Sequence, residues 1–176
     1  MTVGCYPGSF NPPTVAHLAI AEAARDQAGL DRVDLVLSRV PLGKEDLAVP
    51  TVEDRRRVLA AVAATRPWLG VAVTDAQLVA DVAAGYDAVI MGADKWAQVV
   101  DPAWYGGSAA ARDAAVARLP RVLVAPRHGH PPPVGVELLD VPPHLHGVSA
   151  SAVRDGAGHE ARDWLLPEAA AFPDLW

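Results

Sequence analysis

The sequence predicts an α/β fold in which an open parallel sheet carries helices on both faces. Short apolar runs rich in β-branched residues recur along the chain, and stretches rich in Ala, Leu and Arg separate most of them. Hydrophobic residues make up 51% of the chain and charged residues 20%, which is typical of a globular protein rather than a disordered one. The chain has 176 residues and no evident linker, repeat or low-complexity tail, so we expect one domain over residues 1–176.

The expected strands are short and apolar throughout. They span residues 3–6, 33–37, 71–74, 88–91, 122–125 and 138–141. Apolar runs without polar alternation are typical of strands covered on both faces, as in a parallel sheet.

The expected helices lie between these strands. They span residues 14–29, 53–66, 76–84 and 108–118. In the second of them Val58, Leu59 and Val62 fall on one face, as expected for a helix that covers a sheet. Residues 101–107 and 126–135 are rich in Gly and Pro and predict loops. This alternation predicts a Rossmann-like sheet, in which ligands bind beyond the carboxyl ends of the strands.

The charge balance limits the classes of partner. The formal net charge of −6 does not favour a general nucleic-acid binder, which needs a basic face. A single cysteine, Cys5, excludes an intramolecular disulfide, and its apolar surroundings favour a small core residue over a nucleophile. The chain has no signal-peptide pattern and no uninterrupted apolar stretch of about 20 residues, so we expect a cytoplasmic protein without a membrane partner.

The turn between the first strand and the first helix is the most informative segment. Residues 6–17 read Tyr-Pro-Gly-Ser-Phe-Asn-Pro-Pro-Thr-Val-Ala-His, which places Thr14 and His17 about one helical turn apart. The helix N-terminus offers N–H groups and a positive dipole end to an anion, and Gly8 permits close approach. In the alternative, Thr14 merely caps the helix and His17 packs on the sheet. The order Gly-x-Phe-Asn-Pro-x-Thr-x-x-His is longer than capping requires, so we favour a phosphate site.

Other chemistry-bearing residues follow expected strands. Asp94 comes after the strand at 88–91 and Arg127 after the strand at 122–125, so both belong at the same edge of the sheet. Near the C-terminus, Ser149 or Ser151 can cap a short helix that carries Arg154, which predicts either a second anion site or an ordinary capped surface helix. The chain contains neither a P-loop nor a Gly-x-Gly-x-x-Gly segment after a strand.

These motifs resemble those of a known family. The order Gly-x-Phe-Asn-Pro-x-Thr-x-x-His resembles the signature of the nucleotidylyltransferase superfamily. Residues 148–154 are similar to its second signature, Ile-Ser-Ser-Thr-x-Ile-Arg, with Ala150 in place of one hydroxyl. The Gly-Ala-Asp segment at 92–94 and the later Trp104 are similar to nicotinate/nicotinamide mononucleotide adenylyltransferases. Further matches at 53–59, 126–129 and 165–168 extend the resemblance over nearly the whole chain.

The resemblance implies an adenylyltransferase of NAD biosynthesis. It would transfer AMP from ATP to the phosphate of nicotinate or nicotinamide mononucleotide and release pyrophosphate, with Mg²⁺ bound through the ATP phosphates and no dedicated metal site. Relatives are often homo-oligomers. The implied catalytic residues are His17, Thr14, Lys44 and Arg154. The implied nucleotide-binding residues are Gly8, Ser9, Phe10, Gly92, Asp94, Arg127, Ser149 and Ser151, and the acceptor-binding residues are Trp104, Trp96 and Arg55.

The acceptor stays open at this level. Pro7 resembles phosphopantetheine adenylyltransferase, although that enzyme's Arg-Gly-Leu-Arg segment is absent, and a CTP-using variant is a further alternative. Residues 73–78 lack the Tyr-Thr-x-x-Thr-Leu pattern that helps many bacterial relatives to hold nicotinate mononucleotide. Ala16 stands where relatives usually have Gly, and with Ala150 it leaves open a nucleotide sensor without turnover.

Several of these residues also have structural alternatives. Lys44 can be a solvated loop lysine, Trp96 a core residue, Asp94 a helix cap and Arg55 a partner in a structural ion pair. The two His-x-His pairs at 128–130 and 144–146 lie in Pro-rich loops without a clear third ligand, and we expect them to be solvated.

Overall fold

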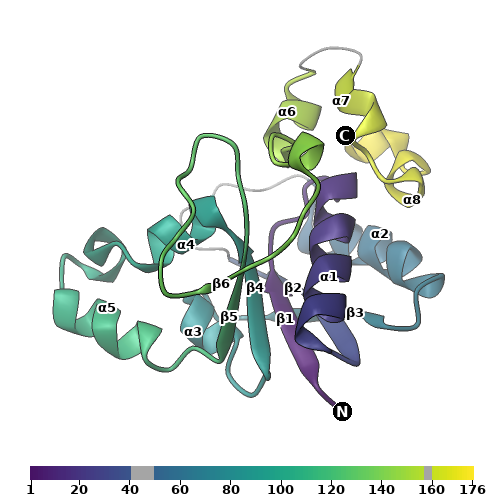
Figure 1. Ribbon diagram of the computed structural model, residues 1–176. Helices are drawn as coiled ribbons and strands as arrows, with labels where there is room; N and C mark the ends of the chain where they lie inside the picture. Colours follow the sequence, from purple (N-terminus) through teal and green to yellow (C-terminus); the bar gives the residue numbers. More distant parts are fainter. Residues whose placement is uncertain (41–49, 157–159) are drawn as a thin grey trace.

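The computed structural model describes residues 1–40, 50–156 and 160–176 (Figure 1). Its centre is a parallel six-stranded sheet with the order β3-β2-β1-β4-β5-β6. The strands are β1 Val3–Pro7, β2 Arg32–Ser38, β3 Leu69–Thr74, β4 Ala88–Gly92, β5 Arg121–Ala125 and β6 Glu137–Leu138. The expected Rossmann-like α/β class is therefore confirmed.

Helices cover both faces of this sheet (Figure 1). The α-helices are α1 Val15–Ala28, α2 Val52–Ala64, α3 Val79–Val82, α4 Ala93–Val99, α5 Ala109–Val116, α6 Ala150–Arg154, α7 Glu160–Asp163 and α8 Pro167–Ala170. Short 3₁₀ helices are η1 Pro102–Tyr105, η2 Pro143–Leu145 and η3 Pro173–Leu175. Among the described residues, no helix has the length and apolar character needed to cross a bilayer.

Two hydrophobic clusters hold the layers together, one on each face. Ile20 of α1 and Leu59 of α2 pack with Leu35 of β2 in the first cluster. Val36 of β2 packs with Val99 of α4 in the second. Leu35 and Val36 are adjacent and point to opposite faces, so one strand supplies both clusters. This arrangement explains why the strands are largely apolar, with few polar residues in their interiors.

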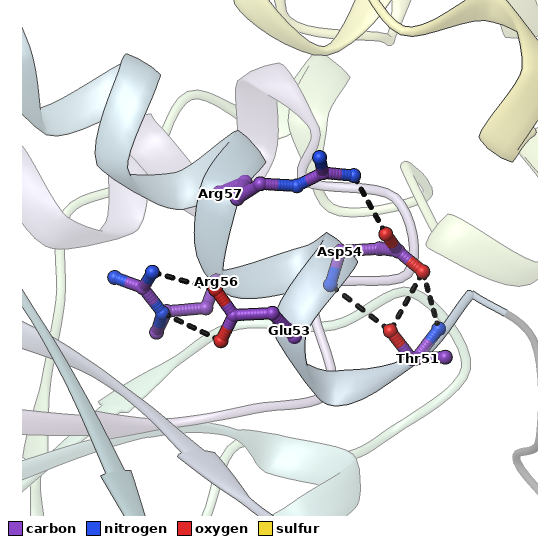
Figure 2. A network of polar contacts seen from close by, with 5 residues as sticks. All are labelled: Thr51, Glu53, Asp54, Arg56 and Arg57. Atoms are coloured by element: carbon purple, nitrogen blue, oxygen red, sulfur yellow. Dashed lines mark hydrogen bonds and ion pairs between the residues drawn. The ribbon is translucent and has the colours of Figure 1, made fainter.

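The first turn of α2 shows why one of three consecutive arginines points inward. Thr51 and Asp54 form a reciprocal capping box, and Asp54 and Glu53 bind Arg57 and Arg56 in surface ion pairs (Figure 2). The side of the helix that carries these ion pairs therefore faces solvent. The remaining arginine, Arg55, lies on the opposite side of the helix and is buried.

The elements depart most from the sequence expectation at three places, and the helices α4, α7 and α8 were not among those expected. The last strand is only Glu137–Leu138, and the N–H of Val141 donates to the carbonyl oxygen of Leu139 in a local turn instead of to a neighbouring strand. The helix expected at 76–84 is reduced to α3, since Ala76 instead forms turn contacts with Thr74. The expected loop at 101–107 contains η1, which Asp101 caps.

Candidate active site

A cavity of about 260 Å³ opens beyond the carboxyl ends of β1 and β4. These neighbouring strands lead to helices on opposite faces, α1 and α4, and the reversal leaves a crevice between the two connections. The cavity is lined by the residues after both strands and by the loop before α6. The expected meeting of the opening turn with Asp94 and Arg127 is therefore observed.

His17 and Thr14 form a reciprocal contact at the start of α1. The backbone N–H of Thr14 donates to Nδ1 of His17 at 3.0 Å, and the Thr14 hydroxyl lies 2.9 Å from the same nitrogen. A neutral imidazole whose Nδ1 accepts a hydrogen bond carries its hydrogen on Nε2. Both residues line the cavity. The contact with Thr14 therefore favours the tautomer of His17 that carries its hydrogen on Nε2.

The Gly8–Asn11 loop is packed tightly beneath His17. Phe10 has φ +44°, an uncommon value for a residue with a side chain, and its buried ring meets His17 edge-on at 5.1 Å. A Cβ at Gly8 would lie 2.9 Å from that ring, so glycine is needed there. The Asn11–Pro12 peptide is cis. The loop thus forms a fixed floor for the imidazole.

Arg55 reaches this loop from beneath. It is only 1% exposed, and its Nη1 donates to the carbonyl oxygen of Ser9 at 2.9 Å, while its Nε has no partner among the described residues. Burial lowers the pKa of the guanidinium. Arg55 is not part of the described cavity wall, so in this structure it supports the loop that carries Ser9.

Asp94 and Arg127 lie together across the switch point. Arg127 Nε is 3.5 Å from Asp94 Oδ1, and Arg127 Nη1 donates to the carbonyl oxygen of Val148 at 2.6 Å. Gly92 leaves room for this arrangement, because a Cβ there would overlap Asp94 Oδ1 in its present position. Arg127 therefore joins the end of β5 to the loop that precedes α6.

The short helix α6 carries the expected second motif. Ser149 caps it by accepting from the N–H of Ala152 at 3.1 Å, and both Ser149 and Ser151 line the cavity. Arg154 donates to the carbonyl oxygen of Asn11 and, at 3.2 Å, to Ser151. Arg154 is outside the described cavity wall and links α6 to the opening loop.

The C-terminal segment braces the start of α1. The N–H of Val15 donates to the carbonyl oxygen of Trp164 at 2.8 Å, and Thr14 forms an antiparallel bridge with Leu165. An ion pair joins α8 to the chain just after α2: Nη1 of Arg66 donates to Oε1 of Glu168 at 2.6 Å. The N–H of Val15 is consequently engaged within the protein rather than offered to an anion. Figure 1 shows α6 to α8 close to the upper end of α1.

The cavity wall also includes aliphatic and aromatic side chains together with two amides and an ammonium: Leu78, Val79, Val82, Val99, Trp104, Tyr105, Gln77, Gln98 and Lys95. Trp104 lies in this wall with 37% of its surface exposed, whereas Trp96 does not line the cavity and packs against the second core cluster. The cavity wall thus combines polar groups with an aromatic surface.

Most of the expected site residues meet at this cavity. Those in its wall are Gly8, Ser9, Thr14, His17, Gly92, Asp94, Trp104, Arg127, Ser149 and Ser151. Phe10, Arg55, Trp96 and Arg154 lie outside the described wall, and Lys44 lies outside the described residues. Sequence reasoning did not single out Gln77, Lys95 or Gln98. The spacing of 94, 95 and 98 on one helix, directly after a strand, was the available signal.

The buried hydroxyl of Tyr6, in the cavity wall, stays protonated. Burial raises the pKa of Tyr6 well above its ordinary value of 10.0, and Asp94 adds to this while Arg127 opposes it.

In the part of the chain that the structure describes, no three His, Cys, Asp or Glu side chains gather as a metal cluster. Asp94 is the one carboxylate in the described cavity wall.

Comparison with known proteins gives consistent matches. The family described as cytidylyltransferase-like matches residues 5–156. A protein of Anaeromyxobacter sp. (strain K) named "Probable nicotinate-nucleotide adenylyltransferase" is 34% identical over 180 residues, which cover 92% of this chain and 87% of that protein. Proteins with the same name from Salinibacter ruber and Rubrobacter xylanophilus are 49% identical over 55 residues and 43% over 65. These two shorter matches cover 31% and 36% of this chain, and 28% and 30% of the respective relatives.

Proposed function

Because the chain belongs to the cytidylyltransferase-like family and is an enzyme of the nucleotidyltransferase kind, we propose that it is a nicotinate-nucleotide adenylyltransferase. In the proposed reaction, a phosphate oxygen of nicotinate mononucleotide attacks the α-phosphorus of ATP. A new bond forms between that oxygen and phosphorus, and the bond to the bridging oxygen of the β-phosphate breaks. The products are the dinucleotide and pyrophosphate.

The contact between Thr14 and His17 is the observation that carries this proposal. The attacking phosphate is already ionised near neutral pH, so the reaction needs positioning and charge stabilisation rather than a strong base. An imidazole whose Nδ1 is held at 3.0 Å by the Thr14 N–H presents its Nε2 hydrogen in a fixed direction. We assign that hydrogen to an α-phosphate oxygen, where negative charge increases in the transition state. Thr14, which is fully buried, acts by positioning His17.

The other phosphate contacts come from the loops around the cavity. Ser9, Ser149 and Ser151 contribute polar groups to the cavity wall. Arg154 holds Asn11, next to the Ser9–Phe10 turn, and reaches the departing pyrophosphate only after leaving that contact. Lys44, which the family resemblance associates with phosphate, is our second candidate for neutralising pyrophosphate.

Magnesium fits this arrangement through the substrate. Mg²⁺ prefers oxygen ligands and is commonly held by substrate phosphates, water and one or two carboxylates. The wall of the cavity supplies one such carboxylate, Asp94, which suits an ion that enters with ATP. When bound, the ion neutralises charge on the phosphates.

The acceptor assignment draws on Trp104 in the cavity wall and on the names of the relatives. An exposed indole beside aliphatic side chains is a suitable surface for a pyridine ring. No described feature favours phosphopantetheine beyond Pro7, which ends β1 and lines the cavity. Nicotinate mononucleotide is therefore our preferred acceptor.

Pyrophosphate release from the purified protein tests the proposal. ATP and CTP are each combined with nicotinate mononucleotide, nicotinamide mononucleotide or phosphopantetheine, and released pyrophosphate is measured with and without Mg²⁺. We expect release with ATP and nicotinate mononucleotide. Pyrophosphate release with phosphopantetheine and no other acceptor overturns the assignment of nicotinate mononucleotide. Tight ATP binding without pyrophosphate release for any acceptor identifies a nucleotide sensor. His17→Ala serves as the inactive control.

A further inference from the structure

Tyr6 is the one tyrosine whose hydroxyl has no hydrogen-bond partner among the described residues. The hydroxyl of Tyr86 donates to Asp34 at 3.3 Å, and that of Tyr105 donates to the carbonyl oxygen of Val99 at 2.9 Å. Tyr6 is buried more deeply than the other two, with 5% of its surface exposed. A buried hydroxyl without a partner lowers stability, whereas phenylalanine fills nearly the same volume without that cost. The fold therefore gives no reason for a hydroxyl at this position.

The oxygen of Tyr6 faces the cavity. In the described part of the chain, the fully enclosed side-chain polar atoms without a partner belong to Asn11, Arg55 and Glu168. Because the Tyr6 oxygen is not one of them, it retains contact with open space. Tyr6 lines the cavity, so that space is the cavity. The hydroxyl is thus a donor presented to whatever the cavity binds.

The ring of Tyr6 is held beside the histidine that we assign to phosphate. Its centroid lies 6.1 Å from that of His17 and 5.5 Å from that of Phe10, which it meets edge-on. Burial raises the pKa of Tyr6 most, while Arg127 lowers it and Asp94 raises it, so both charges act on the phenol oxygen. The hydroxyl stays protonated and adds a neutral donor near a guanidinium and an imidazole. The acceptor that suits neighbouring donors of this kind is an anionic oxygen.

We propose that the hydroxyl of Tyr6 donates a hydrogen bond to a phosphate oxygen of a substrate bound in the cavity. This inference rests on the proposed function, because that reaction brings two phosphorylated substrates to the same cavity. A hydrogen bond to a charged acceptor corresponds to roughly 10- to 100-fold in affinity. The free protein keeps an unpaired buried group at this place, a loss of stability that is common where a residue serves binding.

Replacing Tyr6 with Phe separates a binding role from a structural one. Tyr6→Phe removes the oxygen and keeps the ring, so the melting temperature of the ligand-free protein should equal or exceed that of the wild type. Tyr86→Phe is the matched control, since it loses the contact with Asp34. It should melt at a lower temperature and keep every ligand affinity. A lower melting temperature for Tyr6→Phe indicates a structural hydroxyl and overturns the inference.

Titration calorimetry identifies the source of the phosphate. The ligands are ATP with Mg²⁺, tripolyphosphate, nicotinate mononucleotide and nicotinate riboside, each added alone. If the phosphate belongs to ATP, Tyr6→Phe should weaken ATP and tripolyphosphate by roughly 10- to 100-fold. If it belongs to the acceptor, Tyr6→Phe should weaken nicotinate mononucleotide by the same factor and leave the riboside unchanged. Wild-type affinity for every ligand overturns the inference, as does a loss for ATP without a loss for tripolyphosphate.

These binding measurements do not depend on turnover. A wild type that binds ATP or nicotinate mononucleotide more tightly than Tyr6→Phe does, but releases no pyrophosphate, overturns the proposed reaction and leaves the role of Tyr6 intact. Pyrophosphate release by a wild type whose affinities match those of Tyr6→Phe overturns the role of Tyr6 alone. A wild type that binds none of the four ligands overturns both.

Discussion

The backbone N–H of Thr14 lies 3.0 Å from Nδ1 of His17, so the residue at the third position of α1 caps the helix with its imidazole. In an ordinary capping box a Glu or Gln occupies that position. The histidine takes over this structural role with one nitrogen, and we assign the hydrogen on its other nitrogen to the proposed phosphate contact. The cap and the proposed phosphate contact are thus two functions of one ring.

Replacing His17 with Gln separates these two functions. Glutamine is a normal capping-box residue, so His17→Gln should keep the thermal stability of the wild type. It does not place a donor where Nε2 stands, and removal of one such donor typically lowers kcat by about 10²–10³-fold. Thermal melts and pyrophosphate release measure the two effects. His17→Ala should also lose the cap, at a cost of roughly 0.5–2 kcal/mol. Near-normal turnover of His17→Gln would falsify the assignment of Nε2 as the phosphate donor.

A methyl group at Gly92 should disturb Asp94 without unfolding the protein. In Gly92→Ala the new Cβ meets Asp94 Oδ1, the mobile end of a half-exposed side chain, so the carboxylate moves and the backbone stays. We expect an almost unchanged melting temperature and a fall of roughly 10-fold in kcat/KM for ATP, because Asp94 leaves Arg127. Gly147→Ala is the matched control, since a Cβ there meets nothing within 4 Å. A kcat/KM equal to that of Gly147→Ala contradicts the role of Asp94.

The thiol of Cys5 should resist alkylation in the folded protein. Burial, and to a lesser degree the charge of Asp34, raises the pKa of Cys5 to about 12. Because a raised thiol pKa keeps the group protonated, no appreciable thiolate forms at pH 8 and iodoacetamide has neither a nucleophile nor access. Mass spectrometry should find modification only after unfolding in guanidinium. Equal rates in the folded and unfolded protein contradict the burial of Cys5.

The ion pair between Arg66 and Glu168 should stabilise the C-terminal brace of α1. The two side chains are 21% and 20% exposed, and loss of a hydrogen bond to a charged group costs about 1–3 kcal/mol, so Glu168→Gln should lower the free energy of unfolding by that order. Burial is the largest single influence and raises the pKa of Glu168, but the hydrogen bond from Arg66, a backbone hydrogen bond at Glu168 and the charge of Arg66 together outweigh it, so the net pKa is lowered from 4.5.

A lowered carboxyl pKa also fixes the direction of the pH dependence. The stabilisation from Glu168 is fully present above the pKa of the unfolded chain and is lost as the pH falls through the lower pKa of the folded protein. Denaturant melts of the wild type and Glu168→Gln should therefore differ at pH 6 and converge on acidification. A constant difference down to the lowest pH at which both proteins fold excludes this ion pair as the cause.

Local sequence patterns predicted most of the fold because neighbours along the chain decide most of it. The apolar runs predicted the first five strands, and Cys5 is fully buried as expected of a core residue. The predictions for residues 76–84 and 138–141 were less accurate, since turn contacts at Ala76 and at Val141, whose N–H donates to the carbonyl oxygen of Leu139, override apolar content. Helix capping by Ser149 was likewise available from the sequence.

The sequence by itself determined the parallel α/β class, the position of the opening turn between a strand and a helix, and the resemblance to nucleotidylyltransferases. These depend on periodicity and on residues close in sequence. Only the tertiary structure decided that Arg55 supports Ser9 from below, that Arg154 holds Asn11, and that Lys95 joins the wall containing Trp104. The physical reason is that a long side chain reaches several ångströms in any direction, so its partner depends on which elements the sheet order brings within reach.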